Sequence, residues 1–518
     1  MLSFISVLNS LIMTCGAILA SRRILHYLQL ESYQFLGYKN TLIRQAGKAV
    51  IPYAVLGFLV FLSSLLPGNF AETIVLVLGG YALFSLSLKQ PEKKKFVITA
   101  RVKRLIGVHA VVLVLFYTFI ASLIGVFGAG IVTALLPVIL ALSAFFAWPI
   151  ERFIFYLYFN DARKRLLEND RLIRIGITGS YGKTSVKFIL NTILSQKYNV
   201  LCTPSSFNTP MGVTRIVRER LEPAHQIFIG EMGARHVGEI KELCNLVNPH
   251  IGILTAVGPQ HLDTFRTIER ITKTKNELIE ALPDEGYAVF CNDDAIVTDL
   301  YQKASVEKAL VGKLDSDAWA DDISLSHTGS SFTLHLKGMK PFRCQTVLLG
   351  AHNIANIVAC AKVAQYLHLT AQQIARGISL LKPVEHRLQL LKNAGGITVI
   401  DDAFNTNPRS SQIALDVLSA FPGRRIIVTP GMVELGKDED AFNRAFGEKM
   451  ASCCDIVFLV GKKHTKPIYD GLLEKGFSNE NIYITQTLDE AIRTMNPLLR
   501  EGDVIMYEND LPDHYSEA

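Results

Sequence analysis

The chain has 518 residues, a formal net charge of +6 and a mean hydropathy of +0.26, which is high for a soluble protein. This length predicts about three domains rather than one. The apolar excess lies before residue 150 and basic loops in that region carry much of the charge, so the charge indicates membrane topology and no nucleic-acid surface. The cysteines show no C-x-x-C spacing, which favours scattered thiols in a reducing compartment over disulfides or a metal cluster.

The first 150 residues contain several stretches that are long and apolar enough to cross a bilayer as helices. We therefore expect a transmembrane helical domain over residues 1–150, with about five spans. The candidate spans are residues 2–20, 50–67, 71–88, 106–126 and 130–149. The first could be a signal peptide, but it lacks a basic start and a clear small-residue cleavage site. A buried helical core in a soluble protein is the alternative.

Lysine and arginine residues set the expected orientation of these spans. They gather in loops 21–48 and 89–105 and again after residue 151, whereas turns 67–72 and 127–130 contain none. This distribution predicts a multi-pass plasma-membrane protein whose N-terminus lies outside and whose remaining domains are cytoplasmic, where ATP is. The spans hold almost no ionisable residue apart from His109, which we expect at the membrane interface. The segment is thus typical of an anchor rather than a transport path.

Residues 173–185 combine an alternating apolar strand, a glycine-hinged turn and the start of a helix. Backbone N–H groups and the helix dipole at such a turn attract phosphate, a lysine adds charge and a hydroxyl can reach magnesium. The pattern predicts nucleotide binding, and the alternative is a glycine turn beside a solvated lysine. The spacing differs from the standard phosphate loop, because Ile177 stands where the first glycine should be. The candidate binding residues are Gly179, Ser180, Gly182, Lys183, Thr184 and Ser185.

Two later strands lead to polar side chains that suit a ligand site. One strand ends in Glu231, and the strand over residues 251–258 leads to His261. Open α/β sheets bind ligands at the carboxyl ends of their strands, and hard cations take carboxylate oxygens, so Glu231 is a candidate magnesium ligand. Each residue taken alone is as readily structural. The next helix carries Lys275, whose neighbours Lys273 and Glu277 indicate a solvated helix face.

The rest of the chain predicts more α/β structure. Residues 322–350 alternate as antiparallel strands do, and the polar turn at residues 350–356 opens an apolar helix that a simple cap also explains. Beyond residue 384, short apolar runs alternate with helical patterns, which is typical of a doubly wound sheet. We therefore expect a linker over residues 151–170, an ATP-binding domain over 171–383 and a Rossmann-like domain over 384–518. The loop around Glu434 is either a substrate contact or a surface turn.

A series of ordered motifs between residues 171 and 505 resembles the Mur ligases, which are ATP-dependent amide-forming enzymes of peptidoglycan synthesis. The motifs are TGSYGKT at 178–184, EMGARHVGEI at 231–240, HL at 261–262, KNE at 275–277, GAHNIAN at 350–356, EHR at 385–387 and DDAFNTNP at 401–408. The second and last of these are similar to the branch that adds D-alanyl-D-alanine to UDP-N-acetylmuramoyl-tripeptide. The resemblance implies a central phosphate-loop ATPase domain, a C-terminal Rossmann-like domain, and ATP and Mg²⁺ as cofactors.

The resemblance also implies a role for each matching residue. The phosphate-loop residues would hold ATP, while Thr184, Glu231, His261 and a carbamoylated Lys275 would hold magnesium. The remaining nucleotide contacts would come from Asn353 or Asn356 at the adenine, Arg387 at the γ-phosphate, and Asp402 and Asn405 in the C-terminal domain. The catalytic set would be Lys183, Lys275, His261 and Arg387.

These residue types suit amide formation through an acyl phosphate. Phosphorylation turns a poorly electrophilic carboxylate into a mixed anhydride that an amine can attack. Both steps gather negative charge on phosphoryl oxygens, which magnesium, lysine and arginine stabilise.

Two departures from the family pattern bear on the substrates. The family normally begins with a soluble domain that binds the UDP-sugar, and here membrane helices stand in its place, so the acceptor is expected to be UDP-linked or lipid-linked. The D-alanyl-D-alanine branch tends to end in a Lys-Gly-Ser loop, whereas here Glu508 begins an acidic loop. The amine, an amino acid or a dipeptide, is therefore left open.

Two other functions stay open beside a membrane-anchored cell-wall ligase. One is a synthetase of the poly-γ-glutamate type, which is also Mur-like with an N-terminal membrane segment. The other is a membrane scaffold that binds nucleotide without catalysis, which the complete set of Lys183, Glu231, His261 and Lys275 disfavours.

Overall fold

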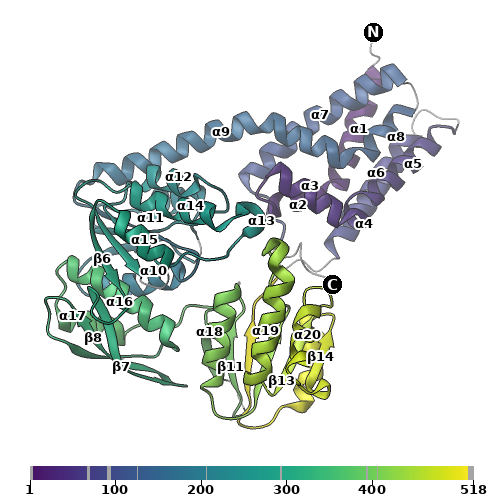
Figure 1. The fold of residues 1–518 in the computed structure, drawn as a ribbon. Coiled ribbons are helices and arrows are strands. Elements are labelled where there is room, and N and C mark those ends of the chain that lie inside the picture. The colour runs from purple at the N-terminus through teal and green to yellow at the C-terminus, as the bar shows by residue number, and fades with distance from the viewer. Residues whose placement is uncertain are drawn as a thin grey trace. The chain divides into compact units, whose positions relative to one another are not determined.

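The computed structural model describes residues 4–66, 71–89, 95–124, 127–205, 207–291, 295–392, 395–404 and 406–511. The chain forms two compact units, Met1–Leu157 and Tyr158–Leu511. The described part of the first unit is helical, whereas the second contains two β-sheets with helices packed on them (Figure 1).

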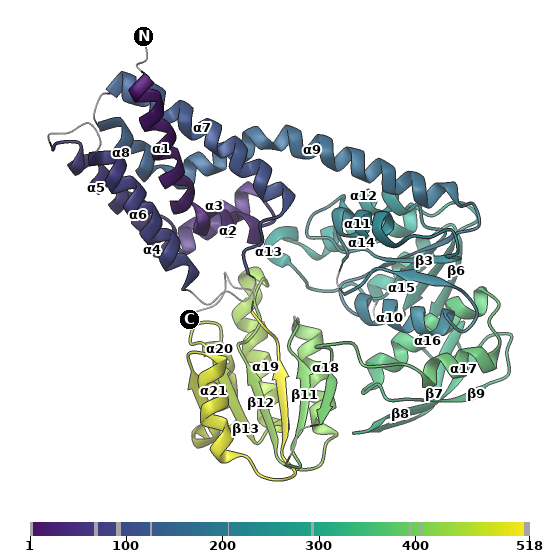
Figure 2. The same ribbon diagram turned by 180° about the vertical axis from the view of Figure 1, so that it is seen from behind.

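The first unit is a bundle of apolar helices around a core of its own. The helices are α1 (Phe4–Ala20), α2 (Arg22–Leu30), α3 (Phe35–Arg44), α4 (Ala46–Ala49), α5 (Ile51–Ser63), α6 (Ala71–Leu88), α7 (Ala100–Ile124), α8 (Gly128–Ala134) and the first part of α9 (Leu136–Glu168). Helix α1 packs against α6 and α7 (Figure 2). A Cβ added at Gly80 would lie 2.2 Å from the carbonyl oxygen of Gly16, so these two glycines allow α1 and α6 to approach closely.

Four described stretches of this unit are long and apolar enough to cross a membrane: Ala46–Ser63, Ala71–Leu88, Ala100–Phe119 and Leu136–Glu168. The pair Val7–Ala20 and Arg22–Leu30, bent by 51°, would make a fifth if it counts as one span. Large apolar side chains point away from the bundle, and Leu115 and Phe153 are 61% and 63% exposed. The expected loop 89–105 ends earlier than predicted, because α7 already begins at Ala100.

The prediction for His109 was wrong. Its side chain is fully buried in the bundle rather than at an interface. Its Nδ1 lies 2.9 Å from Ser143 Oγ, and its Nε2 lies 3.4 Å from Ser21 Oγ. The imidazole therefore links α7 to α9 and to the junction between α1 and α2 through hydroxyl groups. Sequence periodicity does not reveal these partners.

The second unit begins with a nine-stranded sheet in the order β2-β3-β1-β4-β5-β6-β7-β8-β9. Its strands are β1 (Ile173–Thr178), β2 (Val200–Cys202), β3 (Ile227–Glu231), β4 (Ile251–Leu254), β5 (Tyr287–Cys291), β6 (Glu307–Val311), β7 (Ala318–Ser326), β8 (Gly329–Leu336) and β9 (Phe342–Thr346). Strands β1 to β6 are parallel, and β8 and β9 continue the sheet in antiparallel pairs, as the alternation after residue 322 predicted.

Helices cover both faces of this sheet because its strands are apolar on both sides. One face carries α10 (Lys183–Leu194), α16 (Ala351–Tyr366) and α17 (Ala371–Ser379). The other carries α11 (Pro210–Arg220), α12 (Glu239–Val247), α14 (Ile268–Glu280) and α15 (Ala295–Lys303). The end of α9 packs here as well, through Ala162 and Leu166, so much of the expected linker 151–170 is helical.

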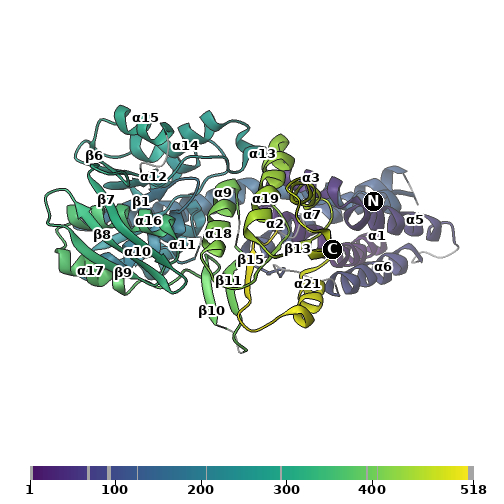
Figure 3. The same ribbon diagram turned by 60° about the horizontal axis from the view of Figure 1, so that its bottom comes forward.

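The C-terminal part of the second unit has its own six-stranded sheet, in the order β10-β11-β15-β12-β13-β14 (Figure 3). The strands are β10 (Gln389–Lys392), β11 (Thr398–Asp402), β12 (Arg425–Thr429), β13 (Ile456–Val460), β14 (Ile482–Thr485) and β15 (Val504–Glu508). Helices α18 (Pro408–Ser419), α19 (Glu439–Cys453) and α20 (Lys466–Glu474) share one core, and α21 (Leu488–Met495) packs in another. The predicted doubly wound arrangement is confirmed, and only the antiparallel edge strand β10 was not foreseen.

Candidate active site

The glycine turn after β1 makes a backbone cradle at the start of α10. Gly182 has a φ of 77° and caps the helix, and a Cβ at Gly179 would lie 2.0 Å from Thr255 Oγ1. Neither position tolerates a larger side chain without strain. The Ser180 amide donates to the carbonyl oxygen of Ala256 over 2.7 Å, which ties the loop to the segment after β4. With Ser185 in the first turn of α10, the cradle fits a phosphate group.

Lys183 is held inside this loop. Its Nζ donates to the carbonyl oxygens of Gly179 and Ser180, at 2.7 and 3.2 Å. Burial lowers the pKa of Lys183 to about 8, the charge of Glu231 opposes that shift and the charge of Arg387 adds to it. The predicted alternative, a solvated lysine, is therefore wrong for this side chain.

Glu231 ends β3 and collects three partners around its carboxylate. Oε1 accepts from Thr184 Oγ1 at 3.2 Å and from Asn208 Nδ2 at 3.0 Å. Oε2 accepts from Lys187 Nζ at 3.0 Å, and both side chains of this ion pair are at most 1% exposed. Thr184 and Glu231 thus present adjacent hard oxygens, which fit Mg²⁺ together with phosphate oxygens.

Among the described residues no group of three His, Cys, Asp or Glu side chains could hold a metal ion. A cation at Thr184 and Glu231 would therefore need the oxygens of a nucleotide to complete its shell. This is the usual situation for Mg²⁺, which keeps waters and substrate phosphates as ligands.

Lys275 lies in α14 and is only 2% exposed, so the predicted solvated face is wrong for it as well. Burial, with the nearby charge of Lys183, holds the pKa of Lys275 well below its ordinary range. Glu277, its expected surface neighbour, instead accepts from the backbone amides of Gly238 and Lys241, each at 2.9 Å. It thereby caps α12 (Glu239–Val247).

His261 stands before the short helix α13 (Leu262–Phe265), and its partner comes from the C-terminal sheet. His261 Nδ1 lies 2.5 Å from Glu434 Oε2, while Glu434 Oε1 accepts from Arg235 Nη2 at 3.3 Å. His261 and Glu434 both have left-handed backbones, with φ of 51° and 65°. Burial lowers the pKa of His261, against the opposing effect of the Glu434 hydrogen bond. The sequence predicted a substrate contact or a surface turn for the Glu434 loop, and the contact with His261 is neither of these.

The two candidate asparagines occupy the first turns of α16. Asn353 is buried and its Nδ2 donates to the carbonyl oxygen of Leu349 at 2.9 Å. Asn356 lies against the phosphate loop, where its Oδ1 is 3.1 Å from the position of a Cβ on Gly182. The polar start of α16 therefore does more than cap a helix, because it borders the glycine cradle.

Arg387 precedes β10 and Asp402 ends β11, and the two charges lie close enough to influence each other. The Arg387 guanidinium sits 4.5 Å from the centroid of the Phe404 ring. Burial lowers the pKa of Arg387, and the carboxylates of Asp402 and Glu231 oppose that shift. Asp402 accepts from the Leu388 amide at 3.1 Å, and burial raises the pKa of Asp402 to about 7. Asn405, the other predicted nucleotide contact, lies outside the described residues.

Electrostatic influence joins the predicted residues into one site. Lys183 responds to the charges of Glu231 and Arg387, and Lys275 responds to Lys183. His261 in turn responds to Lys275. The structure thus brings together side chains from α10, α14, the end of β3, the start of α13 and the segment before β10.

The sequence argument missed Lys187 and Asn208, and it singled out the Glu434 loop without its contact to His261. Lys187 is a buried cation on an otherwise apolar face of α10, and that break in the pattern was its only signal. Asn208 and Glu434 meet their partners Glu231 and His261 through long-range folding, which no local pattern reveals.

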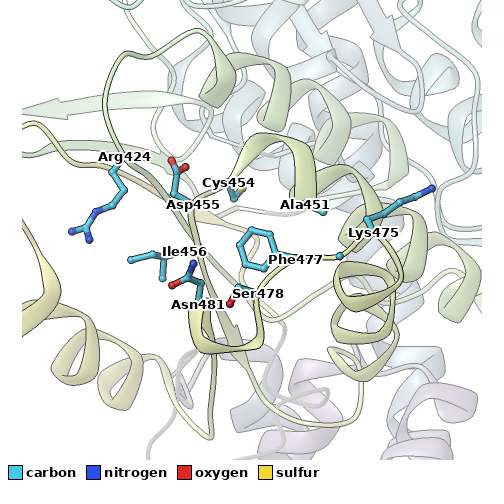
Figure 4. Close-up of a pocket in the computed structure, with 10 residues that line it drawn as sticks. Arg424, Ala451, Cys454, Asp455, Ile456, Lys475, Phe477, Ser478 and Asn481 are labelled. Carbon is cyan, nitrogen blue, oxygen red and sulfur yellow. The ribbon is translucent and has the colours of Figure 1, made fainter.

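The second unit has two notable pockets, and one of them lies near His261. A pocket of about 480 Å³ beside His261 is lined by His236, Val237, Thr264, Phe265, Arg270 and Lys273. Another, of about 430 Å³, lies where β12, β13 and β14 begin and includes Arg424, Asp455 and Asn481 (Figure 4). It sits at the opposite edge of the C-terminal sheet from Asp402, so it is not part of the candidate site.

Comparison with known proteins places these two sheets in one family. Residues 177–364 match the Mur ligase middle domain, and residues 386–507 match the Mur ligase glutamate ligase domain. A UDP-N-acetylmuramoyl-tripeptide--D-alanyl-D-alanine ligase of Escherichia coli is 32% identical over 320 residues, which are 60% of this chain and 70% of that protein. The enzyme of the same name from Bacillus subtilis is 29% identical over 337 residues, 64% of this chain and 72% of that protein.

Solved structures of Mur ligases also resemble this chain. A crystal structure of MurF from Acinetobacter baumannii superposes with a TM-score of 0.64 at 25% identity, over 70% of this chain and 79% of that one. A Thermotoga maritima MurF in complex with ADP gives a TM-score of 0.62 at 25% identity, over 70% and 82%. The chain therefore belongs to the Mur ligase family of ATP-dependent, amide-bond-forming ligases.

Proposed function

We propose that the protein is a membrane-anchored ligase that uses ATP and Mg²⁺ to join a cell-wall precursor carboxylate to an amine through an acyl phosphate. The observation that carries this proposal is the glycine cradle itself, where Lys183 bonds to the loop carbonyl oxygens and Thr184 bonds to the Glu231 carboxylate. The charge of Arg387 acts on the same lysine. The names of its relatives make UDP-N-acetylmuramoyl-tripeptide and D-alanyl-D-alanine the first substrates to test.

The charges of the site suit phosphoryl transfer. Lys183 lies at the glycine loop, and the charge of Glu231 acts on both Lys183 and Arg387. We therefore place these two cations on either side of the transferred phosphoryl group. Mg²⁺, held by Thr184 and Glu231, would neutralise charge on the phosphate oxygens. Asn356, which borders the cradle at Gly182, or Asn353 in the preceding turn of α16 would contact the adenine.

Lys275 fits the proposed carbamoylation. Its depressed pKa favours the neutral amine, which is the form that attacks carbon dioxide. The product is a carboxylate that would lie close to His261, so the modification would replace a lysine cation by a negative charge that suits a metal ion. The amine and carbon dioxide combine with loss of one proton, and no other reactant is required.

Glu434 acts as a positioning residue for His261 in this proposal. Because Nδ1 of the imidazole faces Glu434, its Nε2 is the nitrogen left to face a metal. The left-handed backbone at both residues fixes their approach. Metal binding at His261 would thereby depend on the C-terminal sheet.

The acceptor would enter beside His261. The pocket there combines His236, Arg270 and Lys273 with the apolar side chains of Val237 and Phe265. Such a lining suits an anionic group that carries an apolar part. Helix α9 ends at Glu168 and β1 begins at Ile173, so no separate sugar-binding domain fits between them. We therefore propose a lipid-linked acceptor, with the UDP-linked one as the alternative.

Membrane attachment through residues 1–157 completes the proposal. The apolar stretches of that unit and their exposed leucine and phenylalanine side chains support insertion, and the basic loops support cytoplasmic ligase lobes. The plasma membrane is the corresponding location.

The test is the mass of the product formed by the full-length protein in detergent. ATP and D-alanyl-D-alanine, or a panel of amino acids, are supplied with either UDP-N-acetylmuramoyl-tripeptide or a lipid-linked acceptor. We expect ADP release that requires both acceptor and amine, with preference for the lipid-linked acceptor. A clear preference for the UDP form would contradict the lipid proposal, and ADP release that ignores both substrates would contradict the ligase proposal.

A further inference from the structure

The pocket beside His261 contains charges that the proposed phosphoryl transfer does not use. Its volume is about 480 Å³, and its lining residues come from α13, from α14 and from the segment before α12. Helices α12 and α13 both pack against α14 (Figure 1). The described lining includes no acidic residue and no residue of the glycine cradle at 179–185. The pocket is therefore a second place for a ligand, and its volume is in the range of small-molecule sites.

Two cations of this pocket lie on one ridge of α14. Arg270 and Lys273 are three residues apart, so they share a face of the helix, and both side chains are exposed. Glu277, four residues after Lys273, is the helical neighbour that would pair with it. Instead, the two Glu277 oxygens accept from the backbone amides of Gly238 and Lys241. Within the described residues neither Arg270 nor Lys273 forms an ion pair, so both charges are available to an anionic ligand.

The rest of the lining combines polar groups with apolar surface. His236 contributes an imidazole and Thr264 a hydroxyl, which donates to the carbonyl oxygen of His261 at 3.0 Å. Val237 is 48% exposed, whereas Phe265 is 2% exposed, so apolar surface extends from the solvent to the core. Two cations beside apolar surface suit a ligand that joins an anionic group to an apolar chain.

We infer that this pocket binds the diphosphate that joins the acceptor to its carrier, with Arg270 and Lys273 at the phosphate oxygens and Val237 beside the carrier. The inference rests on the proposed ligase function and names the part of the acceptor that the pocket holds. A guanidinium fork and an ammonium group can each bind one of the two phosphate groups. The sugar and the peptide separate this diphosphate from the reacting carboxylate, which agrees with a pocket outside the glycine cradle. A lipid diphosphate and UDP share this chemistry, and the apolar surface favours the lipid.

The first experiment measures diphosphate binding without catalysis. Full-length protein in detergent is titrated by calorimetry with geranyl diphosphate and, separately, with UDP. ADP and Mg²⁺ are present at saturating concentrations, so the glycine cradle is occupied and does not take up either probe. We expect geranyl diphosphate to bind at least about tenfold more tightly than UDP, because its chain covers apolar surface at Val237 and Phe265.

A double variant tests the two cations. Arg270→Gln with Lys273→Gln should weaken the binding of both probes by at least about tenfold, since each cation provides charge-assisted hydrogen bonds. Because both side chains are exposed, the unfolding midpoint should not change. Arg215→Gln with Lys303→Gln is the matched control. It removes two exposed cations whose ion pairs lie within α11 and α15, and it should leave the binding of both probes unchanged.

The apolar surface has a variant of its own. Val237→Ser should weaken the binding of geranyl diphosphate by about threefold and leave the binding of UDP unchanged. Equal affinities in the wild type and the double variant, or no binding of either probe to the wild type, would overturn the inference. Tighter binding of UDP that the double variant loses would support the diphosphate site and contradict the lipid carrier.

The second experiment uses the acceptor and the amine that support turnover in the product assay. The double variant should raise the KM for the acceptor at least tenfold and leave the KM values for ATP and for the amine unchanged. Geranyl diphosphate binding that depends on the two cations, without turnover of any acceptor, would retain the pocket and refute the ligase. Turnover with an unchanged acceptor KM in the double variant would refute the pocket alone.

Discussion

The two units of the chain place their apolar side chains in opposite ways. In residues 1–157, leucine and phenylalanine side chains such as Leu115 and Phe153 lie on the outside, and the buried residues include hydroxyls and His109. In residues 158–511, the strands bury nearly all their apolar residues, and charged groups cover the surface. The first pattern suits a hydrocarbon solvent and the second suits water.

This contrast shows that buried polar groups serve different purposes in the two units. In the helical unit, the buried polar groups find hydroxyl partners and hold helices together. In the ligase unit, the buried charges Lys187, Glu231 and Lys275 are concentrated at one site, and the partly exposed Lys183 lies beside them. Buried charges are costly, so their concentration at a sheet edge indicates function rather than stability.

The largest expected effect is the loss of catalysis when the ligase unit loses Lys183. Lys183→Ala should lower acceptor- and amine-dependent ADP release by at least about a hundredfold, because the proposed function places this cation at the transferred phosphate. Membrane association should not change. Lys197→Ala is the control, since Lys197 donates to the carbonyl oxygens of Leu367 and His368, away from the phosphate loop, and its loss should leave turnover intact. Unchanged turnover in Lys183→Ala would contradict the assignment of the phosphate loop.

The second prediction sharpens the contrast between the two surfaces. Leu115→Lys places a charge on an exposed apolar position of α7, which should cost about 3 kcal/mol of insertion free energy if that face meets lipid. The protein fraction that resists an alkaline wash of the membrane pellet should fall. Leu314→Lys alters a residue that is 71% exposed in the ligase unit and should leave that fraction unchanged. An equal membrane-resistant fraction for the two variants would contradict a lipid-facing surface on α7.

A smaller effect is expected where the C-terminal sheet reaches His261. Glu434→Ala should raise the Mg²⁺ concentration for half-maximal activity by about 10- to 100-fold, because the imidazole loses its orienting partner. Calorimetric titration of Mg²⁺ into the ATP-bound protein provides a second readout. Glu439→Ala, which breaks a separate ion pair with His464, is the matched control. An unaltered Mg²⁺ titration would show that the contact with His261 has no positioning role.

The smallest effect concerns stability and its pH dependence. The folded pKa of Glu508 is about 8 against about 4.5 when unfolded, so wild-type stability falls as pH rises from 4.5 to 8. Glu508→Gln stays neutral and escapes that loss. Relative to wild type, its free energy of unfolding should therefore increase by at least about 1 kcal/mol between pH 5 and pH 8.5. Chemical unfolding at pH 5 and pH 8.5 checks this, and a gain that is equal at both values would contradict the raised pKa.

Local patterns in the sequence were enough to predict the sheets and the phosphate loop. Alternating isoleucines marked β1, Gly179 and Gly182 marked the turn, and apolar runs marked β11 to β15. The motifs also named Glu231, His261 and Arg387 as members of the site. These features depend on neighbouring residues, so they can be recognised without a fold.

The environments of the same residues could not be predicted locally. Lys275 and its neighbour Glu277 look alike in sequence as surface charges, yet one is buried at the site and the other caps α12. The partners of Glu434 and Glu508 lie 173 and 79 residues away, at His261 and Thr429. For His109 the partners Ser21 and Ser143 come from other helices, and the prediction failed for that reason.

The ion pair between Lys187 and Glu231 satisfies a fully buried carboxylate without a metal ion. A carboxylate sealed inside a protein would ordinarily need a bound cation or a proton to be tolerated there, and Lys187 provides that counterion permanently. In the proposed function, departure of Mg²⁺ with spent nucleotide would then leave no unpaired charge at Glu231. The ligase unit would keep this buried carboxylate paired while one nucleotide replaces the next.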